Sequence, residues 1–270
     1  MDAEEQVKRA VHNNAQWCDA ICRGHKVPGE FHGTYWINHG NVPPYTSKLI
    51  TLAGPKHAAI QLAAIRSLVT AESKAFFSVK DAFQCLDLAP LGFGVLFDAT
   101  WIYWTPGRAL PVDPAQGLKW SVVRNSAELA DWEHVWRASP VNVAVDGRPR
   151  VFAPGLLEEP GLHFLAGKRG DAIVASGAVN RTGDVVGLSN VFSAFARVGP
   201  LFPGCVRLVQ ELYPGIPIVG YERGDNLVAA ERAGFARVHG LTVWHNSARI
   251  AERSLASVSS ASSDGARMRA

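Results

Sequence analysis

Apolar residues recur along the chain with two different periods, and the period distinguishes helices from strands. A return every three or four residues predicts a helix with one buried face, and short apolar runs predict strands. The first part of the chain is expected to contain one or two helices over 4–23, helices over 56–70 and 83–91, and strands over 49–52, 76–79 and 95–104. The segment 24–44 follows neither period and is expected to be an ordered loop, held to the body by Tyr35 and Trp36.

The second part of the chain has a different order of elements. Asn125 and Glu128 have the spacing of a capping box, which predicts the start of a helix over 127–138. The segment 162–193 alternates in the manner of a three-stranded antiparallel meander, with turns at Gly170 and Gly183. The remaining expected elements are strands over 120–123, 216–221 and 238–245 and helices over 204–212 and 225–232.

The proline and glycine content of 105–117 favours a connector over a buried element, so we place a domain boundary there. The boundary gives an N-terminal lobe over 1–110 and a C-terminal domain over 118–248. The serine-rich segment 251–270 is expected to be a disordered tail without a catalytic part.

The two parts of the chain share a weak internal similarity. Aligning Gly92-Phe93 with Gly234-Phe235 brings 76–103 onto 218–245 without a gap, and Thr100 then matches Thr242. Each part also begins with a helix that carries an Ala-x-Trp sequence, Ala15 to Trp17 and Ala130 to Trp132. The similarity predicts a degenerate tandem repeat, with two pseudo-repeated lobes.

Composition and charge exclude several classes of protein. Hydrophobic residues make up 47% of the 270 residues and charged residues 19%, which is typical of a globular chain and excludes a disordered one. No apolar run is long enough to cross a membrane, and the acidic start is unlike a targeting peptide, so a cytoplasmic protein with no membrane partner is expected. The net charge of +3 without a dense basic cluster argues against a nucleic-acid partner.

The order of elements over 120–246 resembles the GNAT superfamily of acyl-CoA-dependent N-acyltransferases. The most specific similarity lies in the closing segment, 217–235, which ends in Ala-Gly-Phe and leads to Leu241-Thr-Val-Trp244. The resemblance implies an α+β fold with a mixed central sheet flanked by helices, and acetyl-CoA or another acyl-CoA as cofactor. The N-terminal lobe resembles a reduced copy of the same unit.

Two departures from the family pattern concern cofactor binding. The family's phosphate loop should follow the third meander strand, where this sequence retains only Arg197 and Gly199 as candidate phosphate contacts. Pro200 and Pro203 remove backbone N–H donors in that region. The family often places a tyrosine four residues before the Gly of Gly-Phe as the acid that protonates the leaving thiolate, and here that position is Ala230.

The resemblance implies roles for residues on the two central strands. Backbone donors of Val191, Phe192 and Ser193 would hold the pantetheine arm and polarise the thioester. Glu222 would act as a base through water, and Tyr221 would replace the missing acid. The alternative is that Glu222 pairs with a neighbouring arginine and that Tyr221 belongs partly to the core. Two further polar residues, Ser189 and Asn190, could bind the acceptor or face solvent.

Five potential metal ligands lie within a short stretch, namely Cys18, Cys22, His25, His32 and His39. Their spacing matches no standard structural zinc site. Cys18 and Cys22 lie one helical turn apart next to Trp17, which favours a buried packing face, and the sparse cysteines favour a reduced compartment. Cys205 is likewise assigned to packing, and no metal is expected.

The sequence thus supports an N-acyltransferase acting on an amine of a small molecule or peptide, with a homodimer as the expected assembly. Two alternatives remain open. One is a GNAT fold that has lost CoA binding and serves as a ligand-binding or protein-interaction module. The other is the same fold repurposed for CoA-independent chemistry, such as a decarboxylase or hydrolase.

Arg197→Ala tests the phosphate contact that the resemblance implies. If the guanidinium donates a charge-assisted hydrogen bond to phosphate, its removal should weaken acetyl-CoA binding by about 1–3 kcal/mol. Isothermal titration of both proteins measures the difference, and an unchanged affinity would exclude Arg197 as a phosphate ligand.

Overall fold

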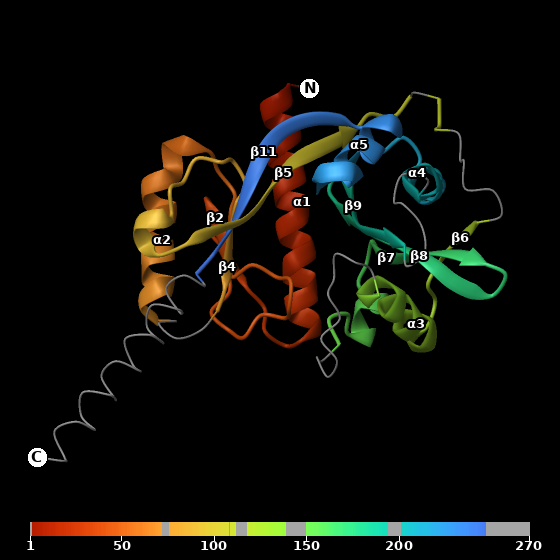
Figure 1. The fold of residues 1–270 in the computed structure, drawn as a ribbon, viewed down its shortest axis with the longest axis horizontal. Coiled ribbons are helices and arrows are strands. Elements are labelled where there is room, and N and C mark those ends of the chain that lie inside the picture. Colours follow the sequence, from red (N-terminus) through yellow and green to blue (C-terminus); the bar gives the residue numbers. More distant parts are fainter. Residues whose placement is uncertain are drawn as a thin grey trace, which may run out of the picture. The chain divides into compact units, whose positions relative to one another are not determined.

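The computed structural model describes residues 2–71, 76–107, 109–111, 118–138, 150–193 and 201–246 (Figure 1). The helices are α1 (Ala3–Gly24), α2 (Ala58–Ala71), α3 (Ser126–Arg137), α4 (Leu201–Leu212) and α5 (Gly224–Arg232). None of the helices in these ranges is both long enough and apolar enough to cross a membrane.

The strands of the first part are β1 (Glu30–Phe31), β2 (Tyr35–Ile37), β3 (Leu49–Thr51), β4 (Ser78–Asp81) and β5 (Gly94–Trp104). Those of the second part are β6 (Lys119–Val122), β7 (Leu162–Arg169), β8 (Ala172–Thr182), β9 (Val185–Ser193), β10 (Ile218–Glu222) and β11 (Ala236–His245). Helices and strands thus mix in an α+β fold, as the sequence predicts.

The chain forms two compact units that interleave along the sequence. Unit 1 contains 1–29, 40–45 and 99–240, and unit 2 contains 30–39, 46–98 and 241–270. The boundaries fall inside β5, after Asp98, and inside β11, after Gly240. The predicted lobes over 1–110 and 118–248, and the tandem repeat, stay predictions, and the predicted tail over 251–270 lies outside the described residues.

The sheet of unit 1 has the strand order β5-β10-β9-β8-β7-β6. Neighbouring strands are antiparallel except β9 and β10, which are parallel. The predicted meander is confirmed as β7, β8 and β9. Its turns are made at Gly170 and Gly183, whose φ angles of 60° and 58° lie in the left-handed region that glycine adopts without steric cost.

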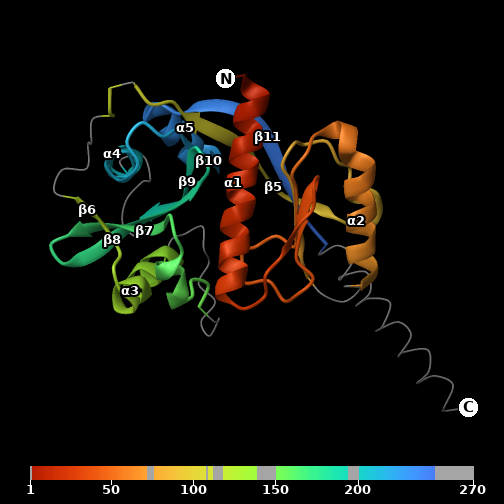
Figure 2. The same cartoon turned by 180° about the vertical axis from the view of Figure 1, so that it is seen from behind.

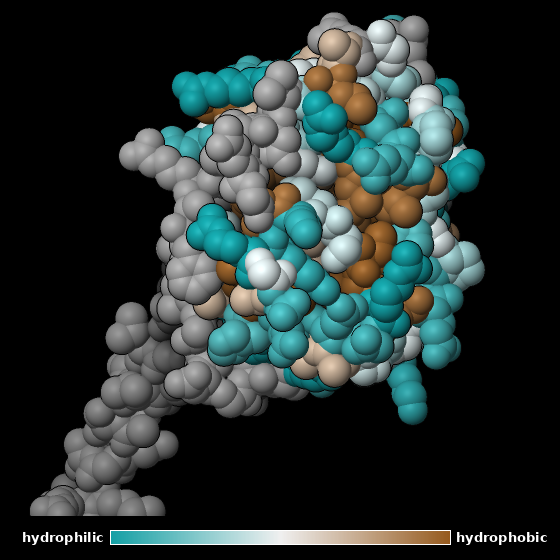
Figure 3. All heavy atoms as spheres, turned by 90° about the vertical axis from the view of Figure 1, so that its right-hand side faces the viewer, coloured by the Kyte–Doolittle hydropathy of each residue, from teal (hydrophilic) through white to brown (hydrophobic). Residues whose placement is uncertain are grey.

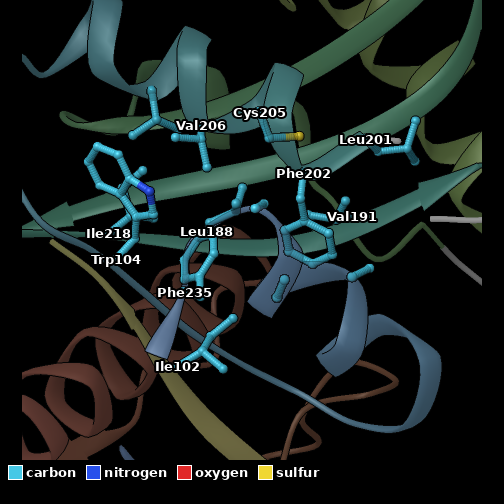
Figure 4. Close-up of a cluster of buried hydrophobic side chains, with 14 of the residues drawn as sticks. Ile102, Trp104, Leu188, Val191, Leu201, Phe202, Cys205, Val206, Ile218 and Phe235 are labelled. Atoms are coloured by element: carbon cyan, nitrogen blue, oxygen red, sulfur yellow. The ribbon is translucent and has the colours of Figure 1, made fainter. Parts of the chain in front are cut away.

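Helices cover both faces of this sheet. Phe164 of β7 contacts Trp17 of α1 and Trp132 of α3, so these two helices share one face. The next residue, Leu165, points to the opposite face and belongs to a buried cluster with residues of α4 and α5. Figure 4 shows side chains of α4 and Phe235 gathered over β9 on that second face.

A buried pair of asparagines fixes α1 to the sheet of unit 1. The Asn13 side chain donates to the Asn180 carbonyl oxygen at 2.8 Å, and the Asn180 side chain donates to the Asn13 carbonyl oxygen at 3.0 Å. A Cβ atom at Gly187 would clash with both side-chain oxygens. Glycine at this position therefore allows the helix to approach the sheet closely.

Unit 2 has the strand order β1-β2-β3-β4-β11, with only β3 and β4 parallel among its described pairs. Its core lies between the sheet and α2, where Ile65 and Leu68 pack with residues such as Leu49 and Val79. Figure 2 shows α2 beside the strands of this unit.

The two Gly-Phe sequences form turns with matching hydrogen bonds. Gly92 and Gly234 have φ angles of 81° and 95°, and each N–H donates at 2.9 Å to the carbonyl three residues earlier. Phe93 and Phe235 are both buried, and each N–H donates to the carbonyl five residues earlier. The two sequences therefore share a local structure as well as two residue types.

The strand that follows each of these turns pairs with a strand from the other part of the sequence. β5 follows Gly92-Phe93 and pairs with β10 in unit 1. β11 follows Gly234-Phe235 and pairs with β4 in unit 2. Each unit therefore completes its sheet with a strand that begins in the distant half of the chain.

Two predicted elements are wrong. The helix expected over 83–91 is absent, and only Ala89–Leu91 forms a short 3₁₀ turn. The buried Asp81 carboxylate accepts N–H groups of Phe83 and Leu86, and Gln84 has a φ of 47°, so the backbone here cannot continue as a helix. The loop expected over 24–44 contains β1 and β2, although Trp36 is fully buried as predicted.

The other predicted elements are confirmed, with shifts at their ends. β4 lies two residues later than expected, and α4 begins three residues earlier, with Pro203 in its first turn, where proline is tolerated. The predicted N-cap is present, because the Asn125 side chain accepts the N–H groups of Ala127 and Glu128 at 3.0 Å.

One side of unit 1, that of β6 and the β7–β8 hairpin, carries apolar residues in small patches among polar ones (Figure 3).

Gly187→Ala should destabilise the protein by about 1–3 kcal/mol, because the added methyl group overlaps the side chains of Asn13 and Asn180. Urea denaturation measures the change. Gly155→Ala is the matched control, since a Cβ there meets no atom within 4 Å, and it should change stability by less than about 0.5 kcal/mol. Equal effects of the two substitutions would contradict the close approach at Gly187.

Candidate functional site

The parallel strands β9 and β10 pair over only two residues. Val186 lies opposite Ile218 and Gly187 opposite Val219, and no later residue of either strand is paired in this register. β10 continues to Glu222 while paired with β5, and β9 continues to Ser193 while paired with β8. The two strands therefore part after Gly187 and Val219. A Cβ at Gly220 would lie 2.5 Å from the Leu188 carbonyl oxygen, so glycine is required at the point of parting.

A bulge interrupts β9 beyond this point. Ser176 pairs with Phe192 and Ala178 with Ser189, which leaves Gly177 opposite both Asn190 and Val191. Asn190 has a φ of 54°, the left-handed conformation that glycine usually supplies in such a bulge. The Ser176 hydroxyl donates to the Asn190 carbonyl oxygen at 3.0 Å. The bulge changes the direction in which the backbone groups of 191–193 point.

The Asn190 side chain is held by α3. The Trp136 indole N–H donates to Asn190 Oδ1 at 3.0 Å, and Asn190 Nδ2 donates to the Ser189 hydroxyl at 2.9 Å. Binding of an acceptor by Ser189 and Asn190 stays a prediction, and both side chains take part in this local network. No local motif marks Trp136 as a site residue, because its hydrogen-bond partner lies 54 residues away along the chain.

Glu222 lies at the end of β10, on the face of the sheet that α4 and α5 cover. Its half-buried carboxylate accepts a hydrogen bond from Asn226 of α5 at 3.3 Å. Burial raises the pKa of Glu222 to about 8, against the smaller opposing effects of the Asn226 hydrogen bond and the Arg223 charge. A carboxyl group with this pKa can exchange a proton near neutral pH.

Tyr221 points to the opposite face of the sheet from Glu222, because adjacent strand residues alternate. Its ring lies edge-on to the buried Trp101 of β5, with centroids 5.4 Å apart. Tyr221 is half-buried, so part of its ring belongs to the packed layer. The two predicted catalytic side chains therefore flank the end of β10 from opposite sides.

The residues predicted to bind the cofactor differ in what they offer. Val191 is buried against α4 and α5, Phe192 is half-buried, and the Ser193 hydroxyl donates to the Val174 carbonyl oxygen at 3.1 Å. Contact with a ligand would thus come chiefly from their backbone. Arg197 and Gly199, and with them the predicted phosphate loop, lie outside the described residues.

Ala230, at the position where the family often has a tyrosine, is fully buried, and its carbonyl oxygen accepts the Phe235 N–H. The side chain at this position belongs to the core cluster of unit 1 together with Phe202 and Phe235. α5 therefore supplies no acid from this position.

Four of the five cysteine and histidine side chains considered for metal binding are buried or make other contacts. Cys18 and Cys22 are buried on α1, the His25 ring contacts the Val151 carbonyl oxygen at 2.8 Å, and His32 stacks on Tyr35. Within the described ranges no three His, Cys, Asp or Glu side chains are grouped to hold a metal ion. Cys205 is buried in the core cluster of unit 1, as predicted.

No protein-family model matches the sequence. A search of curated proteins gives no match either.

Solved structures do match the fold. A GCN5-related N-acetyltransferase from Kribbella flavida has a TM-score of 0.61 at 15% identity, and the match covers 88% of this chain and 95% of that one. A GCN5-related N-acetyltransferase from Sphaerobacter thermophilus has a TM-score of 0.52 at 11% identity, covering 91% and 93% of the two chains.

A third structure, from Novosphingobium aromaticivorans and assigned to the GNAT family, has a TM-score of 0.51 at 12% identity, with 85% of this chain and 94% of that one covered. Each match covers both parts of the sequence. These matches show that the chain shares the fold of these N-acetyltransferase structures.

Proposed function

We propose that the protein is an acyl-CoA-dependent N-acyltransferase that acts on an amine of a small molecule or peptide. The observation that carries the proposal is the opening between β9 and β10 where the two strands part beside a bulge. The Glu222 carboxylate lies at the end of β10, beyond this point. The fold shared with N-acetyltransferases supports this function.

The backbone of β9 suits the thioester part of an acyl-CoA. Beyond Gly187 the edge of β9 on the side of β10 is no longer paired with β10. Its peptide groups can therefore pair with the amides of a pantetheine arm. The bulge at Asn190 directs those N–H groups of 191–193 that do not pair with β8, and such fixed donors can stabilise the negative charge that develops on a thioester oxygen. Bound acyl-CoA would supply an activated acyl group.

Glu222 would accept the proton of the attacking amine through water. Only its ionised form is a base, and a pKa of about 8 means that this form increases as the pH rises through 8. Tyr221 flanks the end of β10 on the other face, so we assign it the proton donation to the leaving thiolate that Ala230 cannot provide.

A module that has lost CoA binding is the second candidate, and two observations favour it. Pro203 lies in the first turn of α4, where a phosphate-binding helix would present N–H donors, and Ala230 replaces the usual acid. This candidate keeps the fold and the opening but predicts no thioester consumption. A decarboxylase or hydrolase that uses the same opening would also be independent of CoA.

Acetyl-CoA distinguishes these candidates. The proposed function predicts that it raises the melting temperature in a concentration-dependent manner, because a ligand that binds only the folded state stabilises it. It also predicts thiol release when a panel of primary amines is added. The absence of both effects at millimolar acetyl-CoA would exclude the transferase and leave the module or the CoA-independent enzyme.

Glu222→Gln tests the base. The native protein should show kcat/KM rising with pH through an apparent pKa near 8, and the variant should lose this step together with about 100-fold or more of the rate. Glu211→Gln, an exposed residue of α4, is the matched control and should keep the native profile. A step near pH 8 that persists in Glu222→Gln would assign the base to another group.

A further inference from the structure

Asn190 occupies a backbone conformation that most residues avoid. Its φ of 54° places it in the left-handed region, where a Cβ atom approaches the following carbonyl oxygen and where asparagine is tolerated better than most other residues. In the commonest bulge of this shape a glycine fills the position. An asparagine there needs contacts that favour the left-handed form over the extended one.

Contacts from two elements outside β9 converge on this residue. The Trp136 indole N–H from α3 donates to the side-chain oxygen at 3.0 Å, and the Ser176 hydroxyl from β8 donates to the main-chain oxygen at 3.0 Å. The two donors hold different groups of one residue, the side chain and the backbone. Together they fix both the orientation of the amide and the direction of the peptide that follows it.

Trp136 is itself well anchored. Only 3% of its surface is exposed, and its ring lies edge-on to Phe152 and to Tyr45, with centroids 5.0 and 5.2 Å away. Phe152 also contacts Trp132 and Phe164, so the indole belongs to a packed aromatic layer between α3 and the sheet. A donor on such a layer can hold its acceptor in a fixed place.

We propose that Trp136 is a positioning residue for acyl transfer, an inference that rests on the proposed function. Its indole N–H holds Asn190 in the left-handed form and so keeps the bulge that aims those backbone donors of Val191–Ser193 that do not pair with β8 at the thioester carbonyl. Trp136 does not touch the reacting atoms. It acts through Asn190, and its loss affects the rate of the chemical step more than the binding of acyl-CoA.

Trp136→Phe removes the N–H group and keeps an aromatic ring. We expect kcat to fall about 10- to 100-fold, as for a small displacement of catalytic groups, with KM for acetyl-CoA within about threefold of the native value. Trp132→Phe is the matched control, because this indole is on the same helix and in the same layer but donates to the Leu165 carbonyl oxygen at 2.8 Å. Trp132→Phe should lower the stability of the protein without the selective fall in kcat at unchanged KM that we expect for Trp136→Phe. Equal kinetic effects of the two substitutions would overturn the proposal.

Asn190→Gly provides a second test, because glycine adopts the left-handed form without help. In the Asn190→Gly background, Trp136→Phe should have no further effect on kcat, and the double variant should be faster than Trp136→Phe alone. A double variant that is as slow as Trp136→Phe, or slower, would show that the tryptophan acts by another route.

Amide NMR spectra of the free proteins separate this inference from the proposed function. Trp136→Phe should shift the amide signals of 189–192 more than Trp132→Phe does, whether or not acetyl-CoA is a substrate. Unshifted signals would overturn the role of the indole in the bulge. If Trp136→Phe shifts these signals but the native protein releases no thiol from acetyl-CoA, the proposed function is rejected, and the role of Trp136 in catalysis is rejected with it.

Discussion

The candidate site depends on the unequal pairing of β10 with its two neighbours. Five residues of β10 pair with β5, but only two pair with β9. β5 therefore sets the direction of β10, while β8 sets that of β9, and the two central strands separate where these constraints conflict. Gly220 permits the close approach at the point where they separate, and Glu222 follows two residues later. The chemistry proposed here requires that the sheet remain unpaired at this place.

The N-terminal helix acts on the same point from one face of the sheet. Gly187 is the last residue of β9 that pairs with β10, and it is the residue against which Asn13 of α1 packs. The reciprocal hydrogen bonds of Asn13 and Asn180 tie the helix to β8 beside it. On the other face, α4, α5 and Phe235 pack over Leu188 and Val191. The end of the paired region is therefore held by buried contacts on both sides.

The apolar pattern is sufficient to predict most of this fold, because the helices bury one regular face and the strands of the meander are apolar runs bounded by turn glycines and buried on both faces. It failed over 83–91, where the Asp81 carboxylate accepts backbone hydrogen bonds, because such a contact does not affect the spacing of apolar residues. Glu222 and Val191–Ser193 could be proposed from the family resemblance. The bulge could not be predicted, because it arises from the register of β8 against β9. Trp136 could not be predicted either, because its role depends on the position of α3 relative to the bulge.

The exchange of strands after the two Gly-Phe turns bears on how the protein is made. The β5–β10 pair joins residues more than 110 positions apart, and the β4–β11 pair joins residues more than 150 apart. Contacts between such distant segments form late, because the loop they close must be ordered first. While the first half is emerging from the ribosome, β10 and β11, which pair with β5 and β4, have not yet been synthesised. We expect a nascent chain with two open sheet edges that depends on chaperones until β11 is complete.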